Sequence, residues 1–263
     1  MTAPTITIRP VTDVAELRAI EDLQLAVWRM PERDIVPLHH LLAASGAGGR
    51  VLGAFTPEGT LVGFCYGFAG VRGGRTLFYS HMAGVLAEFR DRDVGFRLKQ
   101  AQREAALAGG FEWMVWTYDP LQSGNAYFNL HKLGGEARRY HVNYYGAMRD
   151  ELNRGTESDR LEVDWWLRDP RVHALMRGEA PGVPEGEVLR IDVPADITAL
   201  RRRDPHAAAA WRQTTRGQFL DAFSAGYVAV DVDRLPDRSA YLLVRRAERS
   251  GAQKGPVDAH RTR

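Results

Sequence analysis

The sequence predicts an α+β fold in which a mixed, mostly antiparallel sheet is flanked by helices. Apolar, strand-like segments at residues 51–55, 61–68 and 76–85 are joined by short turns rich in glycine and proline, which is typical of an antiparallel meander. A helical pattern at 94–108 lies between the strand at 76–85 and a second apolar strand at 111–118. Such a strand–helix–strand unit forms a right-handed parallel crossover.

The composition is that of a globular protein with a packed core. The chain has 263 residues, of which 44% are hydrophobic and 26% charged, and its net charge is +2. This balance indicates no nucleic-acid or membrane partner, and no apolar run reaches the ~18 residues that span a bilayer. Because the N-terminus has no secretory pattern, we expect a cytoplasmic protein. The single cysteine, Cys65, excludes an internal disulfide, and its apolar strand pattern predicts a buried, unreactive thiol.

The first elements are predicted from alternation and capping. Residues 5–9 alternate and are β-branched, which predicts a strand. Asp13 is a suitable N-cap for a helix at 14–28, and a second, shorter helix is expected at 37–44.

The helix at 94–108 and the strand at 111–118 have the clearest patterns. The helix carries one apolar stripe, made by Val94, Leu98, Ala101, Ala105 and Ala108. Residues 111–118 are almost continuously apolar, as in a strand covered on both faces. A short helix is then expected at 123–132.

The remaining chain is predicted to complete the first domain and to add a small C-terminal extension. The expected elements are strands at 138–145, 161–167, 188–192, 227–232 and 240–245 and helical material at 196–223. Glycines and prolines at 178–186 indicate a linker. We therefore expect a catalytic domain at 1–168, a C-terminal α/β extension at 187–246 and a flexible tail at 247–263.

The turn before the helix at 94–108 predicts an anion site. It reads Arg90-Asp91-Arg92-Asp93-Val94-Gly95. A strand that enters a helix through a tight loop presents unpaired backbone N–H groups and the positive end of the helix dipole. The two arginines add positive charge.

Residues 76–134 resemble the core of the GNAT superfamily of N-acyltransferases. The family signature is a strand, the pattern Arg/Gln-x-x-Gly-x-Gly/Ala and a helix, to which residues 90–95 correspond, and Leu133-Gly134 matches the end of a later family helix. The resemblance extends over residues 5–167 and implies a sheet with a splayed parallel strand pair. It also implies that the loop binds the pyrophosphate of acetyl-CoA or succinyl-CoA, with the pantetheine arm beside Val85.

Two positions depart from the family pattern. Asp93 stands where the family has the first glycine of the pair, and we expect its carboxylate to cap the helix and to weaken cofactor affinity. Leu130 stands where the family has a tyrosine that acts as general acid. Tyr127 is the alternative proton donor, and Asn125 is a candidate ligand of the pantetheine. Both residues are equally well explained by helix packing or capping.

Two residues are candidates for the general base. His81 lies four residues before Val85, and some family members similar to the arylalkylamine acetyltransferases have a catalytic histidine there. An imidazole pKa near ~6.5 suits the task. The alternative is a structural histidine. Asp119 follows the strand at 111–118, at the end where open α/β sheets place ligands. Its alternative, a turn residue before Pro120, is the better explanation.

The residues that bind the acceptor amine are predicted from their position in the family pattern. In the family, the segment matching residues 30–40 lines the acceptor pocket, and Glu32, Arg33, His39 and His40 are polar there. Solvated loop charge is the alternative. The histidines do not form a metal site with His81. A branch of the family with a similar C-terminal extension implies an amino-acid acceptor.

These observations predict an acyl-CoA-dependent N-acyltransferase. It would move an acetyl or succinyl group to the primary amine of a small molecule by direct attack in a ternary complex. The alternatives are a non-catalytic acyl-CoA sensor of the same fold and an assembly protein with a vestigial site. The C-terminal extension either closes the acceptor cleft or builds a homodimer.

Overall fold

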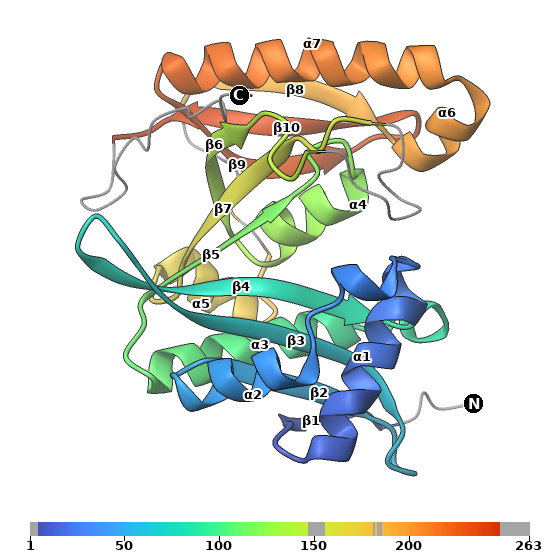
Figure 1. Cartoon of the computed structure of the whole chain (residues 1–263). Helices are drawn as coiled ribbons and strands as arrows, with labels where there is room; N and C mark the ends of the chain where they lie inside the picture. The colour runs from blue at the N-terminus through green and yellow to red at the C-terminus, as the bar shows by residue number, and fades with distance from the viewer. Residues whose placement is uncertain (1–4, 147–155, 181, 183–185, 248–263) are drawn as a thin grey trace, which may run out of the picture. The chain divides into compact units, whose positions relative to one another are not determined.

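The computed structural model describes residues 5–146, 156–180, 182 and 186–247 (Figure 1). The described residues form two compact units. The N-terminal unit holds residues 5–114, and the C-terminal unit holds 115–146 and 156–247. The boundary lies within strand β5 (Trp113–Tyr118). The sequence instead suggests a boundary near residue 168, which would group residues 115–167 with the N-terminal elements.

The N-terminal unit contains an antiparallel meander. Its strands are adjacent in the order β1, β2, β3 and β4, and each neighbouring pair is antiparallel. The strands are β1 (Thr7–Pro10), β2 (Arg50–Phe55), β3 (Leu61–Arg72) and β4 (Arg75–Val85). The expected meander is confirmed, and β3 is four residues longer than its apolar pattern because it continues to the Gly73-Gly74 turn.

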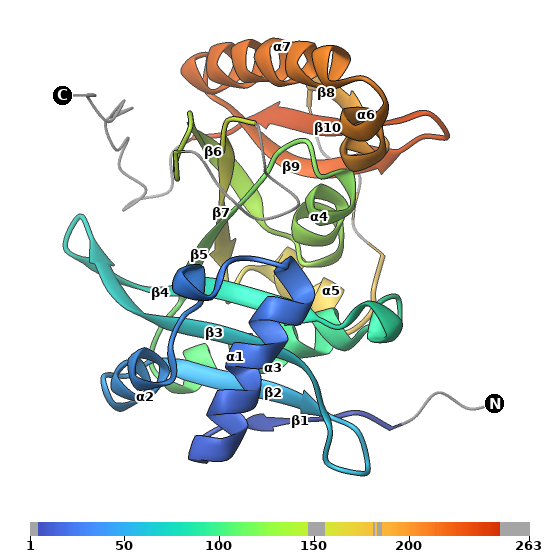
Figure 2. The same ribbon diagram turned by 45° about the vertical axis from the view of Figure 1, so that its right-hand side comes forward.

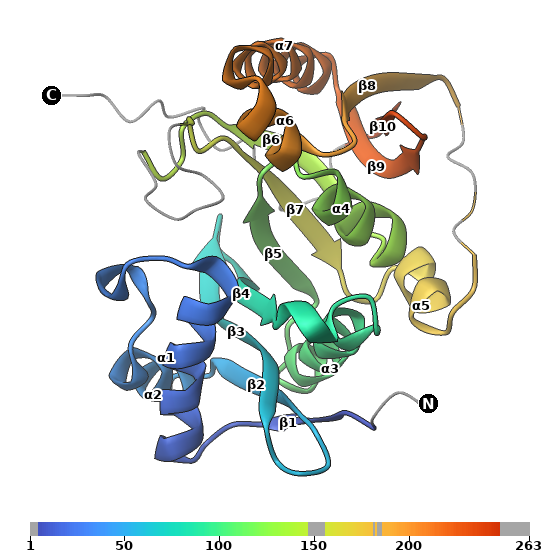
Figure 3. The same ribbon diagram turned by 90° about the vertical axis from the view of Figure 1, so that its right-hand side faces the viewer.

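Helices cover both faces of this meander (Figure 3). The helical elements are α1 (Val14–Trp28), η1 (Glu32–Asp34), α2 (Leu38–Gly46), η2 (Ala87–Phe89) and α3 (Val94–Ala108). Asp13 caps α1, since its carboxylate accepts hydrogen bonds from the backbone N–H groups of Ala15 and Glu16. The bounds expected for α1 and α3 are those of the structure.

The alternation of strand side chains produces two cores in this unit. Phe64 and Tyr66 pack with the helices α1 and α2, whereas Cys65 packs with Val94 and Leu98 of α3. Successive side chains of a strand point to opposite faces, so β3 contributes to both cores. Figure 2 shows α1 crossing one face of these strands.

The C-terminal unit contains a larger set of strands, in the order β5, β7, β6, β9, β10 and β8. The strands after β5 are β6 (Glu136–His141), β7 (Arg160–Trp166), β8 (Val188–Pro194), β9 (Tyr227–Arg234) and β10 (Arg238–Arg245). Strand β9 pairs with β6 through Ala137 and Ala229. The C-terminal extension therefore continues the same sheet and shares its core.

The helices of the C-terminal unit include one that the sequence patterns did not predict. They are α4 (Ser123–Ala126), the π-helix η3 (Tyr127–Lys132), α5 (Pro170–Met176), α6 (Ile197–Arg203) and α7 (Pro205–Ser224). Helix α5 is the unpredicted one, and Asp169 caps it. The expected polar link near 153–156 and the expected tail lie largely outside the described residues. Among the described helices, none is long and apolar enough to cross a bilayer.

The expected fold class, a mixed and mostly antiparallel sheet flanked by helices, is confirmed.

Candidate functional site

The loop before α3 has an unusual backbone. Asp91 and Asp93 both have positive φ angles, of 58° and 54°. Glycine adopts this left-handed conformation most readily, and aspartate is among the few other residues that tolerate it. Glycine, the residue of the family pattern, would adopt this conformation without strain, and this chain adopts it with an aspartate.

Asp93 begins α3, but its carboxylate does not cap the helix. Its carbonyl accepts the first helical hydrogen bond from the Arg97 N–H group at 2.9 Å, whereas its side chain makes no capping hydrogen bond. Capping residues usually have extended backbones that direct the side chain back to the first turn. The left-handed backbone of Asp93 prevents this, so the expected capping role is wrong.

The loop fits a phosphate-bearing group. The first N–H groups of α3, including those of Val94 and Gly95, have no intrahelical acceptor. Alternating left-handed residues form a concave arrangement of N–H groups that suits anions. The Arg90 Nε atom donates to the Val85 carbonyl at 3.2 Å, which ties the loop to the end of β4. The Arg92 guanidinium lies 5.6 Å from the centre of the Phe89 ring.

His81 lies at a β-bulge in strand β4. Tyr66 of β3 pairs with Met82 and Gly67 pairs with Ser80, so His81 is the extra residue between two pairs. Bulges redirect the side chain of the extra residue and are common beside active sites.

His81 belongs to a cluster of rings that we call the histidine–aromatic cluster. It consists of His40 on α2, Tyr66 and Phe68 on β3, and Tyr79 and His81 on β4. The ring of His81 lies 5.9 Å from that of Tyr66 and 6.0 Å from that of Phe68. The ring of His40 also lies 6.0 Å from that of Tyr66. The structure therefore brings together two of the residues singled out from the sequence.

The cluster lowers the pKa of His81. Its main cause is the loss of water around the imidazole, and the nearby His40 lowers it further because two imidazolium groups repel. The residue itself remains exposed. The lowered pKa favours the neutral form of this exposed imidazole.

The hydroxyl of Tyr66 is a buried polar group within the histidine–aromatic cluster. The residue is fully buried, and its hydroxyl has no hydrogen-bond partner within the described part of the chain. Burial raises the pKa of this phenol, so the hydroxyl stays protonated. A ligand that reached the cluster would find a hydrogen-bond donor there.

The segment before α2 is held rigidly by α1. Gln24, which is buried, exchanges two hydrogen bonds with the backbone of Val36, at 2.8 and 3.0 Å. The carboxylate of Glu21 accepts a hydrogen bond from the Leu38 N–H group at 2.6 Å. The candidate acceptor residues Glu32 and Arg33 are exposed on this segment and His39 is exposed on α2, and only His40 joins the cluster.

Asp119 has a structural environment in the C-terminal unit. Its two carboxylate oxygens accept hydrogen bonds from Arg212 of α7 at 2.7 and 2.9 Å, and one also accepts from the Leu121 N–H group. Both residues of the ion pair are buried. These contacts favour the turn interpretation over a role as base.

Tyr127 stacks on a residue that the sequence did not single out. Its ring lies 4.3 Å from that of His131, and the His131 Nδ1 atom lies 2.8 Å from the Asp231 carboxylate. Asp231 is on β9, 100 residues along the chain, so no local pattern pairs it with His131. Asn125 is exposed on α4, and Leu130 is fully buried. Leu130 is a core residue in this chain.

Metal binding has no support in residues 5–146, 156–180 and 186–247. No group of three or more His, Cys, Asp or Glu side chains there is arranged to hold a metal ion.

The chain is similar to solved structures in its fold, but no known family or curated protein matches it in sequence. No protein-family model and no curated protein matches the chain. A candidate acetyltransferase from Acinetobacter baylyi is 14% identical over 65% of this chain and 96% of its own, with a TM-score of 0.53. YncA of Salmonella typhimurium, a candidate acetyltransferase solved with acetyl-CoA, is 19% identical over 63% and 95%, with a TM-score of 0.50.

A candidate acetyltransferase of the GNAT family from Desulfovibrio desulfuricans also matches. It is 9% identical over 62% of this chain and 99% of its own, with a TM-score of 0.51. The expected resemblance to the GNAT superfamily is confirmed as a likeness of fold. These proteins match along nearly their whole lengths, whereas more than a third of this chain lies outside the match.

Proposed function

We propose that this protein transfers an acyl group from acyl-CoA to the primary amine of a small molecule. The observation that carries the proposal is the neutral, exposed His81, which a bulge redirects on the strand that leads into the α3 anion loop. Neutral imidazole accepts a proton from an amine nucleophile, and correctly placed proton transfer accelerates such reactions by roughly 10²–10⁴-fold.

The loop residues would hold the diphosphate of coenzyme A. The N–H groups of Val94 and Gly95 and the side chains of Arg90 and Arg92 supply its positive environment, and Asn125 is the proposed ligand of the pantetheine arm. Acyl-CoA itself supplies the electrophilic thioester and the thiolate leaving group. Acetyl-CoA and succinyl-CoA are the donors to be tested.

Residues of the chain would manage two protons. His81 accepts one from the acceptor amine as that amine attacks, and Tyr127 donates one to the departing sulfur. Direct transfer is favoured because Cys65 is a poor acyl carrier. Its thiol is fully buried, donates a hydrogen bond to the Leu98 carbonyl, and has a pKa that burial raises to about 12.

The acceptor would approach along the segment before α2. Glu32 and Arg33 are exposed there, His39 is exposed at the start of α2, and His40 belongs to the histidine–aromatic cluster. An amino acid is the first acceptor class to test, because the exposed Arg33 suits a carboxylate.

Thiol release tests this proposal directly. The full chain is incubated with acetyl-CoA or succinyl-CoA and a panel of amines that includes amino acids. We expect amine-dependent thiol release with at least one pair. If coenzyme A binds but no amine promotes thiol release, the protein is instead an acyl-CoA sensor, the alternative that Asp93 and Leu130 favour. If coenzyme A does not bind, the assembly role is favoured.

A further inference from the structure

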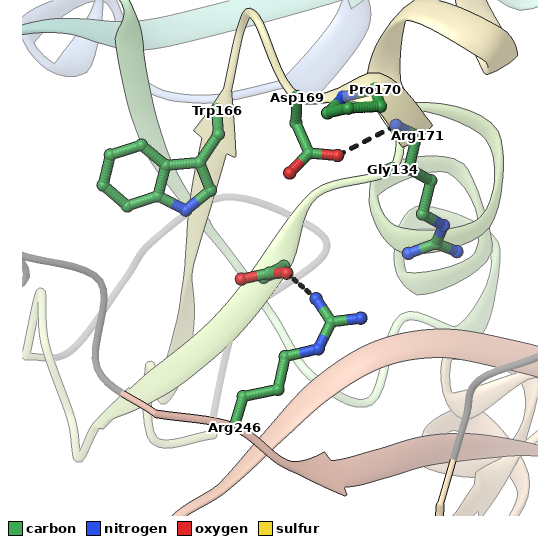
Figure 4. Close-up of a pocket in the computed structure, with 7 residues that line it drawn as sticks. Gly134, Trp166, Asp169, Pro170, Arg171 and Arg246 are labelled. Carbon is green, nitrogen blue, oxygen red and sulfur yellow. Dashed lines mark hydrogen bonds and ion pairs between the residues drawn. The ribbon is translucent and has the colours of Figure 1, made fainter.

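A pocket in the C-terminal unit lies among residues that the proposed acyl transfer does not use. Its volume is about 310 Å³, and it is bordered by Trp166 at the end of β7, Asp169 and Arg171 at the start of α5, Glu136 of β6 and Arg246 after β10 (Figure 4). This volume lies at the lower end of the range for small-molecule sites.

Ion pairs fix the charged side chains around the pocket. Glu136 accepts hydrogen bonds from Arg246 and, at 3.1 Å, from Arg138. The Arg246 side chain is 38% exposed and that of Glu136 only 5%, so Arg246 is the member of the pair that a ligand can reach.

Hydrogen bonds to strand β9 hold the guanidinium of Arg171. It donates to the Val230 carbonyl at 2.6 Å and to the Asp231 carboxylate at 3.2 Å. Burial is the main cause that lowers the pKa of Arg171, and the charge of Arg246 contributes in the same direction. The carboxylates of Asp231, Glu136 and Asp169 act in the opposite direction.

The formal charges of the side chains that line the pocket sum to zero. Glu136 and Asp169 are acidic, and Arg171 and Arg246 are basic, so the pocket is dipolar but neutral. A ligand with net charge would leave that charge uncompensated in a partly buried site. A zwitterion keeps the balance, because each of its charged groups meets an opposite one. The indole of Trp166 borders the same pocket (Figure 4).

We propose that this pocket binds a zwitterionic α-amino acid, with its carboxylate on Arg246 and its ammonium group on Asp169. An aliphatic side chain would lie against Trp166. This site is additional to the proposed acyl transfer and does not depend on it, since binding requires no acyl donor.

Titration calorimetry of the full chain without coenzyme A tests the proposal with three matched probes. L-leucine carries both charges, 3-methylbutylamine lacks the carboxylate and 4-methylpentanoate lacks the ammonium group. We expect L-leucine to bind at least about tenfold more tightly than either analogue, because each lost charge-assisted hydrogen bond costs about that factor or more. Equal binding of the three probes, or no binding of L-leucine, would overturn the proposal.

Variants locate the site. Arg246→Gln and Asp169→Asn should each weaken L-leucine binding about tenfold or more, and asparagine retains the capping ability of Asp169. Arg190→Gln is the matched control, because Arg190 pairs with Asp233 on the surface of the same unit, away from the lining residues. Circular dichroism checks that each variant is folded. Unchanged binding in both pocket variants, or an equal loss in Arg190→Gln, would contradict the assignment.

Discussion

His81 and Asp119, the two candidate bases, differ in their exposure and in their bonding partners. His81 is exposed among aromatic rings, which lower its pKa without engaging it in an ion pair. Asp119 is 6% exposed, and Arg212 binds both of its oxygens. An aspartate held this way is stabilised as a counter-ion and cannot act as a mobile base. A position at the end of a strand suggests a catalytic base, but the ion-pair partner of the side chain decides whether that side chain can accept a proton from a substrate.

Lys99 shows that a lowered pKa alone does not identify a site. It lies on α3, where it donates to the Ser80 hydroxyl at 2.9 Å and the Gln102 side-chain carbonyl at 3.0 Å. Burial lowers its pKa to about 7. The residue is only 3% exposed, however, so no substrate can reach it. The pKa of His81 is also lowered, but its side chain is exposed and a substrate can reach it.

The largest expected effect comes from removing the proposed base. His81→Gln should lower amine-dependent thiol release by roughly 10²–10⁴-fold, because glutamine cannot accept the proton. The melting temperature should change little, since His81 is exposed. His206→Gln, at an exposed position at the start of α7, is the control. Full activity in His81→Gln would remove His81 from the mechanism and leave the base unassigned.

Asp119 should behave in the opposite way. Asp119→Asn leaves Arg212 buried without its counter-ion, which we expect to cost about 3–5 kcal/mol of unfolding free energy. Urea denaturation measures this loss. Thiol release per folded molecule should stay near that of the wild type. A stable Asp119→Asn variant with abolished turnover would revive Asp119 as the base.

Lys99 should make stability depend on pH. Its folded pKa of about 7 lies below the unfolded value of 10.5, so the unfolded chain binds the extra proton between these values. Stability should therefore rise with pH in this window, by about 2–3 kcal/mol from pH 7 to pH 9.

Lys99→Met should flatten this dependence and raise stability most below pH 7, where the wild-type lysine is charged in both states. Denaturation at several pH values checks this. An unchanged slope in Lys99→Met would assign the pH dependence to other groups. Turnover at saturating substrate should be unaffected in the variant, which separates Lys99 from His81.

The smallest effect is expected in the anion loop. Asp93→Gly removes a negative charge near the proposed diphosphate site and suits the left-handed backbone at φ 54°. We expect about fivefold tighter coenzyme A binding by calorimetry, equivalent to about 1 kcal/mol. Asp93→Asn, which removes the charge and retains the shape, separates the two causes. Weaker binding in Asp93→Gly would contradict the idea that Asp93 reduces affinity.

The sequence by itself determined the elements whose causes are local. The bounds of α1 and α3 follow from Asp13, the apolar stripes and the Gly109-Gly110 ending, all within a few residues of each helix. The meander follows from short turns, and the anion loop from its place between a strand and a helix. These features were enough to predict the fold class, whereas His81 was selected through the resemblance to the GNAT superfamily.

Only the tertiary structure decided which of the selected residues are available for chemistry. Arg212 reaches Asp119 across 93 residues, and Asp231 reaches His131 across 100. No periodicity or spacing encodes such pairs, because they depend on how the C-terminal strands join β6. The bulge at His81 likewise depends on the register between β3 and β4. The local patterns therefore determined the elements, and the long-range pairing determined the electrostatic surroundings of each candidate residue.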